Sequence, residues 1–148
     1  MILVDANLLL YAYDSTSRFH ESSRRWLEEV LSGNQPVGLP WTTLLAFLRI
    51  STNPRAMSQP LSLDEASAIV SGWLDQPCVT VPAPGERHWK ILVKLLLGAQ
   101  AKGPLVTDAH LAALALEHGA LLATTDRDFT RFDGLRFENP LAPKAPSA

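Results

Sequence analysis

The sequence predicts an α/β domain built around a mainly parallel β-sheet. Short apolar runs of β type alternate along the chain with longer segments whose apolar residues recur at helical spacing. Two of these short runs end at or near an aspartate, and functional sites of open parallel sheets collect beyond the carboxyl ends of the strands. The 148 residues, 47% hydrophobic and 19% charged, suffice for one domain with its own hydrophobic core.

The first part of the chain predicts a strand and two helices. Residues 2–4 form a short apolar run that stops at Asp5, which indicates a buried first strand. A helix over residues 7–13 follows at once. Residues 18–31 place apolar side chains at helical spacing, and Ser-Gly-Asn at 32–34 ends this second helix.

The middle of the chain predicts one strand and two further helices. Residues 36–39 are a candidate second strand. Residues 41–50 are strongly apolar and helical, and Thr-Asn-Pro at 52–54 ends them. The next helix, over 62–73, opens with the Ser-x-x-Glu pattern of a capping box.

The last part of the chain completes the alternation. We predict a strand at 79–81, helices at 86–101 and 107–118, and strands at 120–124 and 135–137. Gly119 stands where helices commonly stop. We therefore assign residues 1–141 to one domain and residues 142–148, rich in proline and alanine, to a flexible C-terminal tail.

Composition and charge argue against several classes of protein. A net charge of −2 argues against a protein that coats nucleic acid by electrostatics alone. Because no uncharged apolar stretch is long enough to cross a bilayer, we expect no membrane association. No signal peptide is apparent, and the single Cys78 cannot form an internal disulfide, which suits a cytoplasmic protein.

Three acidic sites stand at the ends of predicted elements. Asp5 and Asp126 follow predicted strands, and Asp108 lies in the first turn of a predicted helix, on its buried stripe. Carboxylates that converge at one sheet edge repel each other, and a proton or a cation must relieve that repulsion. Oxygen ligands favour magnesium or manganese over zinc. Such an ion suits phosphoryl chemistry, because it can bind a phosphate oxygen and activate a water.

Each acidic site also has a simpler explanation. Asp5 could cap the following helix by accepting from the amide of Asn7 or Leu8. Asp108 could merely complement the helix dipole. The cluster at residues 124–128 could be a polar turn held by an ion pair. Together the three sites favour a functional cluster over three separate coincidences.

The chain resembles the PIN-domain nucleases, especially VapC-like toxins of type II toxin–antitoxin (VapBC) pairs and their mycobacterial branch. The resemblance covers nearly the whole chain. The segments that carry it are VDANLLLYA, LPWTTLLAFLRISTNPR, VTDAHLAALALEHGALLATTDRDFTRF and the terminal NPL. It implies a three-layer α/β/α sandwich with a sheet of four to five strands, and magnesium-dependent hydrolysis of RNA.

The resemblance also implies a role for each site residue. Asp5, Asp108 and Asp126 would be the catalytic metal ligands, with Asp128 as a possible fourth ligand. Asn7 would hold Asp5. Two further residues, Thr124 and Thr125, could orient a carboxylate or a water. Arg127 and Arg131 could contact RNA phosphates, or be ordinary surface arginines.

The sequence departs from the family pattern at one point. PIN domains commonly carry a glutamate in the helix that matches residues 41–49, whereas no acid lies between Val30 and Leu63 here. The matching position is Thr43 or Ala46. The site would then hold its ion through fewer carboxylates, and a partner-binding protein with a weakened nuclease site is the alternative.

Two other enzyme classes fit less well. A haloacid-dehalogenase-type phosphatase also uses a strand-end aspartate and magnesium, but it needs a second acid two residues later, where this chain has Asn7. A ribonuclease-H-like fold begins with an antiparallel meander, whereas a helix follows the first strand here. Neither is favoured.

The resemblance and the residue spacing also lead to expectations about partners, histidines and tryptophans. We expect an RNA substrate, a VapB-like antitoxin that obstructs the acidic pocket, and a homodimer formed by the helices at 41–50 and 62–73. The four histidines show no metal-ligand spacing, and we expect no metal role for them. The four tryptophans fall in predicted helices, where core packing or an interface is expected.

Overall fold

The computed structural model describes residues 1–143 and contains a five-stranded sheet in which every strand runs parallel to its neighbours. The strands are β1 (Ile2–Val4), β2 (Val37–Gly38), β3 (Val79–Thr80), β4 (Leu121–Ala123) and β5 (Phe137–Glu138). Their spatial order is β3-β2-β1-β4-β5. The predicted, mainly parallel sheet is thus confirmed, and the number of strands is five.

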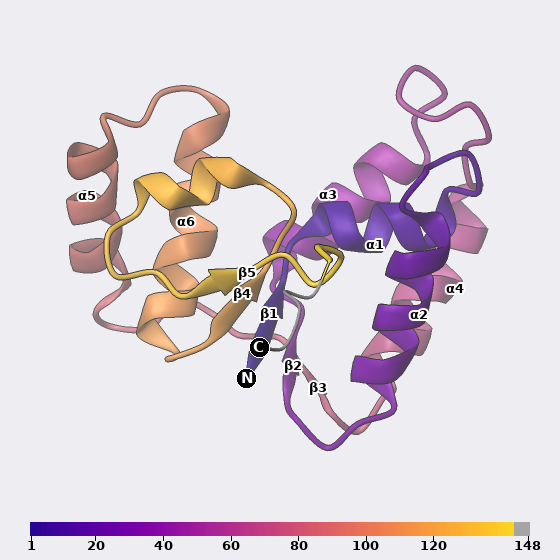
Figure 1. The fold of residues 1–148 in the computed structure, drawn as a ribbon, viewed down its shortest axis with the longest axis horizontal. Coiled ribbons are helices and arrows are strands. Elements are labelled where there is room, and N and C mark those ends of the chain that lie inside the picture. The colour runs from indigo at the N-terminus through magenta and orange to yellow at the C-terminus, as the bar shows by residue number, and fades with distance from the viewer. Residues whose placement is uncertain (144–148) are drawn as a thin grey trace.

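Helices cover both faces of this sheet. Figure 1 shows α1 to α4 on one side, with α5, α6 and the short 3₁₀ helix η1 on the other. The helices are α1 (Ala6–Tyr13), α2 (His20–Leu31), α3 (Trp41–Ser51), α4 (Leu63–Leu74), α5 (His88–Ala99), α6 (Pro104–Glu117) and η1 (Arg127–Arg131). The three-layer α/β/α architecture is confirmed.

The alternation of side chains along β1 divides the hydrophobic core in two. Ile2 and Val4 join the core formed with α1 to α4, whereas Leu3 joins the core formed with α5, α6 and η1. Successive side chains of a strand point to opposite faces, so three consecutive apolar residues in β1 serve both layers. β1 is therefore buried on both sides and lies at the centre of the sheet.

The strand order places a topological switch at β1. From β1 the chain builds the sheet outwards through β2 and β3, then returns to pair β4 with the other side of β1. The pairing continues past the strands, since the amide of Asp5 donates to the carbonyl of Ala123 at 3.0 Å. In open parallel sheets, ligands bind at such a point, beyond the carboxyl ends of the strands.

The start of α6 differs from the prediction. The helix begins at Pro104, one turn before the predicted start at 107, and Asp108 therefore lies in its second turn. Gly103 adopts a φ of +57°, and the proline that follows has its φ fixed near the helical value and needs no amide partner at this position. The expectation that Asp108 lies in the first turn was wrong.

Two other expectations concern the chain as a whole. Among the described residues, none of the helices combines the length and the apolar character that a membrane crossing requires. The boundary between the domain and its predicted tail stays a prediction, because residues 144–148 of that tail lie outside the described part of the chain.

Candidate active site

Asp5 sits between the first strand and the first helix and is held by two hydrogen bonds. Its Oδ1 accepts from the amide of Ala6 at 2.8 Å, and its Oδ2 accepts from the hydroxyl of Thr124 at 2.7 Å. Asp5 is therefore the N-cap of α1, although it uses the amide of Ala6 and not that of Asn7 or Leu8. Burial raises the pKa of this carboxyl above its ordinary value, and the two hydrogen bonds oppose that shift.

Thr124 connects Asp5 to the second acidic segment. The Thr124 side chain is 1% exposed, and its hydroxyl oxygen also accepts from the amide of Asp126 at 3.0 Å. Asp126 in turn caps η1, because its Oδ1 accepts from the amide of Asp128 at 2.8 Å. Of the two threonines that sequence reasoning left open, Thr124 makes these contacts, whereas Thr125 has no side-chain hydrogen bond within residues 1–143.

Asp108 faces the other acids from α6. Carboxylate oxygens of Asp108, Asp126 and Asp128 all lie within 4.8 Å of one another. Burial raises the pKa of Asp108 to about 6, and the negative charges of Asp126, Asp5 and Asp128 add to this shift. Four aspartates from three separate segments of the chain therefore interact at the carboxyl edge of β1 and β4.

The donor set fits a hard divalent cation. Each of these side chains offers carboxylate oxygens, and the raised pKa of Asp108 reflects burial first and then repulsion by the other acids, both of which a cation would offset. Asp5 has both oxygens engaged by Ala6 and Thr124 but still lines the same cleft as Asp108 and Asp126. No histidine or cysteine belongs to the cluster among the described residues, which disfavours zinc.

The cleft beside the acids has a volume of about 170 Å³. Thr43 and Ala46, the two positions that match the missing glutamate, both line it. The hydroxyl of Thr43 is buried and donates to the carbonyl of Val4 at 2.8 Å, so it serves the fold. Ala46 presents only a methyl group, and α3 contributes no carboxylate to the cleft.

Uncharged polar residues also line the cleft beside the acids. Asn7 lines the cleft, but the Asp5 carboxylate accepts its hydrogen bonds from Ala6 and Thr124 and not from the predicted partner Asn7. Thr42 and Thr107 also line it, and sequence reasoning missed both. Their signal was their position: Thr107 directly precedes Asp108, and Thr42 lies one helical turn before Ala46.

The two arginines lie on the same short helix as part of the cluster. Arg127 and Arg131 are the first and last residues of η1, and both are exposed. Arg131 lines a different groove, between η1 and α5. Their predicted contact with RNA phosphates stays a prediction.

Comparison with known protein families decides between the enzyme classes. Residues 2–135 match the PIN domain family. The chain belongs to the PIN-domain family. It is 44% identical to Ribonuclease VapC37 of Mycobacterium tuberculosis, over 96% of this chain and 99% of that protein. It is also 40% identical to Ribonuclease VapC43 of the same species, over 95% of this chain and 96% of the relative.

Solved structures of other proteins share this fold. VapBC2 from Rickettsia felis, bound to a DNA fragment from its promoter, superposes with a TM-score of 0.68 at 17% identity, over 94% of this chain and 98% of the other. VapC20 of Mycobacterium tuberculosis, described as a toxin that cleaves the sarcin-ricin loop, superposes with a TM-score of 0.65 at 16% identity, over 92% and 99% of the two chains. At these identities the likeness establishes the fold alone.

Membership settles several expectations. The predicted relation to VapC ribonucleases of the mycobacterial type is confirmed, and this PIN-domain protein is an enzyme of that ribonuclease family. The haloacid-dehalogenase alternative is excluded. PIN nucleases depend on metal ions, and the acidic cluster of Asp108, Asp126 and Asp128 provides a matching set of ligands.

Proposed function

We propose that this VapC-family ribonuclease is the toxin of a toxin–antitoxin pair in the cytoplasm and hydrolyses RNA with a magnesium ion held by Asp5, Asp108 and Asp126. Asp128 assists them, and manganese can replace magnesium. One observation carries the proposal: oxygens of Asp108, Asp126 and Asp128 lie within 4.8 Å of one another at a cleft that Asp108, Asp126 and Asp5 line. Such an arrangement of like charges is stabilised by a divalent cation.

In the proposed reaction, the ion would activate the phosphate and the water, and the protein would orient the carboxylates that hold the ion. When bound, a magnesium ion polarises a phosphate oxygen, lowers the pKa of an attacking water and stabilises the leaving oxygen. The chain supplies orientation, because Thr124 and Ala6 fix the Asp5 carboxylate through both of its oxygens. Asp126 is oriented through its own amide and through the amide of Asp128.

Asp108 is the acid of the cluster whose charge depends most on pH near neutrality. Its pKa of about 6 lies closer to neutrality than that of an ordinary aspartate, so the carboxyl can hold a proton in mildly acidic solution. A cation at the cluster favours the charged carboxylate, and binding of the ion therefore releases that proton. Among the described acids, Asp108 is the one whose protonation competes most directly with metal binding.

The alternative is a partner-binding protein with a weakened nuclease site. The absence of an acid at Ala46 favours it, since α3 leaves one wall of the cleft without a ligand. A ribonuclease assay separates the two readings. We expect cleavage of RNA in magnesium, no cleavage in chelator, and a loss of at least about 100-fold for Asp108→Asn.

The control for this assay is Asp64→Asn. Asp64 is an exposed aspartate of α4, outside the cleft, and the same change there should leave cleavage unaffected. Cleavage that persists in chelator, or an Asp108→Asn enzyme as active as the Asp64→Asn enzyme, would contradict the metal-dependent mechanism.

We also propose a VapB-like antitoxin as the protein partner. The fold is shared with chains solved as VapBC and FitAB assemblies, such as FitAB bound to a DNA fragment. A cationic side chain of the antitoxin would find three carboxylates in the cleft, those of Asp5, Asp108 and Asp126, with the exposed Asp128 close to two of them. Expression of this chain alone should arrest growth, and co-expression of a VapB-like protein encoded beside it should restore growth. If expression of this chain alone does not arrest growth, the toxin role is refuted, whereas the proposed nuclease activity is unaffected.

The homodimer remains part of the proposal. Trp41 and Leu45 lie on one face of α3, and their side chains are 56% and 59% exposed. Leu45 also lines a shallow surface shared by α3 and the start of α6, next to the acidic cleft. Apolar surface of this kind commonly marks an interface. Sedimentation of the wild type as a dimer and of Leu45→Glu as a monomer would support it, and a monomeric wild type would exclude it.

A further inference from the structure

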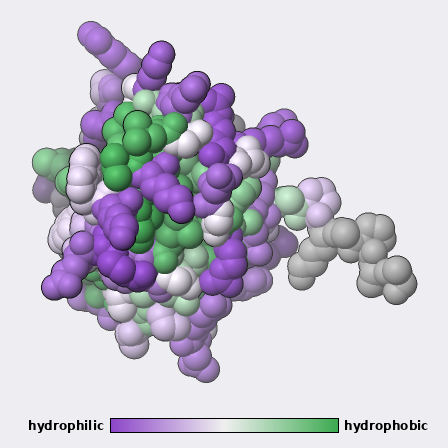
Figure 2. Space-filling model, turned by 90° about the vertical axis from the view of Figure 1, so that its left-hand side faces the viewer, coloured by the Kyte–Doolittle hydropathy of each residue, from purple (hydrophilic) through white to green (hydrophobic). Residues whose placement is uncertain are grey.

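A second groove, larger than the acidic cleft, lies between α5 and the segment that follows η1. Its volume is about 390 Å³, compared with about 170 Å³ for the acidic cleft, and lies in the range of sites that bind small organic groups. We call it the α5 groove. Apolar side chains form its floor, and those that matter here are Ile91, Leu95 and Leu116. Figure 2, which shows the molecule from the α5 side, has hydrophobic surface on this face that hydrophilic side chains border and interrupt.

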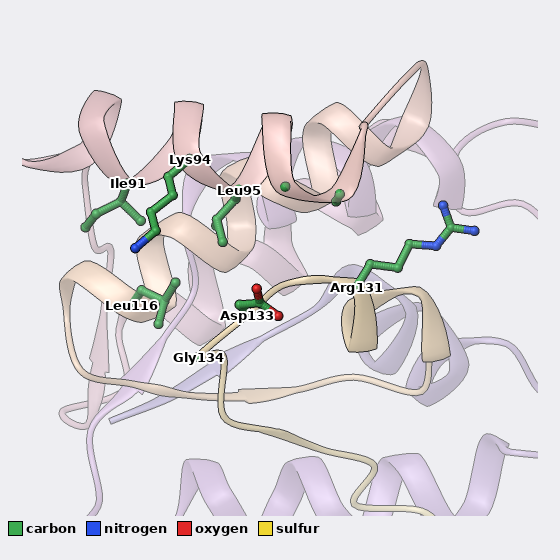
Figure 3. Close-up of a pocket in the computed structure, with 9 residues that line it drawn as sticks. Ile91, Lys94, Leu95, Leu116, Arg131, Asp133 and Gly134 are labelled. Atoms are coloured by element: carbon green, nitrogen blue, oxygen red, sulfur yellow. The ribbon is translucent and has the colours of Figure 1, made fainter.

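Charged groups stand at both ends of the α5 groove and in its middle. Figure 3 shows Lys94 at one end and Arg131 at the other, with the Asp133 carboxylate between them. The guanidinium of Arg131 extends away from the apolar floor. Within residues 1–143, none of these three side chains takes part in an ion pair. Two cations and one acid are thus available to a ligand.

The α5 groove is joined to the acidic cluster by a single short helix. Asp126 is the N-cap of η1, Arg131 is its last residue, and Asp133 follows two positions later. A 3₁₀ helix rises about 2 Å per residue, so about 10 Å separates Asp126 from Arg131 along the helix axis. A short stretch of single-stranded RNA spans this distance. An RNA strand at the acids can therefore reach the groove.

We propose that the α5 groove is a subsite for one unstacked guanine of the RNA substrate, an inference that rests on the ribonuclease function proposed above. The base lies on the floor of Ile91, Leu95 and Leu116. A phosphate beside this base meets Lys94, and a phosphate further along the strand meets Arg131. Sequence-specific recognition of RNA relies on such splayed bases, read along their Watson–Crick edges.

Asp133 selects guanine among the four bases. The Watson–Crick edge of guanine offers two adjacent donors, its ring N–H and its exocyclic amine, and both oxygens of one carboxylate can accept from them. The amine of adenine or cytosine stands beside a ring nitrogen acceptor, which repels a carboxylate. The single N–H of uracil lies between two carbonyl oxygens. Only guanine satisfies the Asp133 carboxylate without an opposing acceptor.

Gly98 provides a test that does not disturb the fold. It lies in α5 and lines the groove, and a Cβ placed there would meet no atom within 4 Å. Gly98→Leu should therefore fill the groove and strengthen the helix slightly, because glycine is a poor helix former. Gly72→Leu is the matched control: Gly72 is also helical, also has free space around it, and lines a groove on the other side of the protein.

The decisive measurement is the affinity of the full chain for short oligouridines that carry one central guanosine, inosine or adenosine. Fluorescence anisotropy in chelator keeps the RNA intact. We expect the guanosine oligomer to bind best, and inosine, which lacks the exocyclic amine, to lose that preference. Gly98→Leu should weaken guanosine binding about 10-fold and Gly72→Leu should not. Equal affinity for guanosine and inosine, or equal effects of the two leucines, would overturn the proposal.

Two charge variants assign the individual contacts. Asp133→Asn should abolish the preference for guanosine over inosine, and Lys94→Ala should weaken the binding of all oligomers alike. Lys90→Ala is the control for Lys94, because Lys90 is exposed on the same helix but does not line the groove. If Lys90→Ala weakens RNA binding as much as Lys94→Ala does, Lys94 acts only by general electrostatic attraction, and the proposed subsite is contradicted.

The outcomes separate this inference from the proposed function. If the wild type cuts no RNA in magnesium while Gly98→Leu still removes guanosine binding, the nuclease proposal fails and the subsite stands. If magnesium-dependent cleavage is normal and all the groove variants bind RNA as the wild type does, only the subsite fails. Should Gly98→Leu spare RNA binding but prevent a co-expressed antitoxin from restoring growth, the groove docks a protein and the proposal is overturned.

Discussion

The hydroxyl of Thr124 donates a 2.7 Å hydrogen bond to the carboxylate of Asp5, across 119 positions of the sequence. The two residues follow the neighbouring parallel strands β1 and β4, which brings their side chains to one edge of the sheet. The same hydroxyl accepts from the amide of Asp126. One buried side chain thus orients two of the acids.

We predict that Thr124→Val weakens both the fold and the metal site. Valine has nearly the shape of threonine but can neither donate to Asp5 nor accept from Asp126. The lost hydrogen bonds should destabilise the protein by about 2 kcal/mol. The pKa of Asp5 should rise further, since the bond from Thr124 opposes the effect of burial. Thermal unfolding and the magnesium dependence of RNA cleavage measure the two effects.

Thr124→Ser is the control, because serine keeps the hydroxyl and loses only a methyl group. It should retain most of the activity and need little more magnesium than the wild type. If the serine and valine variants lose the same activity, the hydroxyl does not orient Asp5, and the effect belongs to packing alone.

The acidic site could be predicted because it follows from backbone rules. Strands of a parallel sheet end at the same edge, so acids after two apolar runs were expected to meet, and Asp5 and Asp126 do interact there. The choice between Thr124 and Thr125 could not be predicted, since β4 ends at Ala123 and the turn beyond it has no periodic pattern. The side chain that turns inwards there depends on the tertiary structure.

Helix boundaries and distant contacts were predicted less well. The start of α6 was placed by its apolar stripe, whereas Gly103 and Pro104 determine it through their backbone preferences. The contact between Nε2 of His88 and Nδ1 of His110, at 2.9 Å, joins two helices 22 positions apart. No motif in the sequence signals a pair of this kind, because only the packing of α5 on α6 creates it.

We predict that Asp108→Asn stabilises the ion-free protein above pH 6. The pKa of Asp108 in the folded chain is about 6, above its ordinary value of 3.8, so loss of the proton disfavours the folded state. The penalty is absent below pH 3.8, grows as pH rises towards 6, and is complete above that. Because the carboxyl is only half-buried, water screens it, and we expect a gain of about 1 kcal/mol.

Thermal unfolding in chelator, followed across this pH range, measures the effect. The gain of Asp108→Asn over the wild type should vanish below pH 3.8, where the Asp108 carboxyl is neutral in both the folded and the unfolded chain. Magnesium should raise the melting temperature of the wild type more than that of the variant. A variant less stable than the wild type at neutral pH would show that burial and the neighbouring acids do not disfavour the charged Asp108 carboxylate in the folded chain.

We predict that His110→Gln makes the protein less sensitive to mild acid. Burial lowers the pKa of His110 below its ordinary 6.5, and the neighbouring His88 adds to the effect. The Oε1 of Glu117 lies 3.9 Å from the Nδ1 of His88, on the other side of that ring. A lowered pKa means that protonation disfavours the folded state, so stability present above pH 6.5 is lost as pH falls. Melting temperatures at neutral and mildly acidic pH should differ less in the variant. An identical acid dependence in both proteins would contradict this role.

We predict that Ala46→Glu strengthens metal binding. Ala46 lines the acidic cleft from α3, at the wall where no carboxylate stands, and glutamate is a good helix former. A further carboxylate should lower the magnesium concentration for half-maximal cleavage about 10-fold. It should also destabilise the ion-free protein and raise the pKa of Asp108, because it adds negative charge to the cluster.

Ala56→Glu, the same change at an exposed position after α3, controls for net charge. A magnesium requirement equal in the two variants would place the Ala46 side chain too far from the ion to act as a ligand.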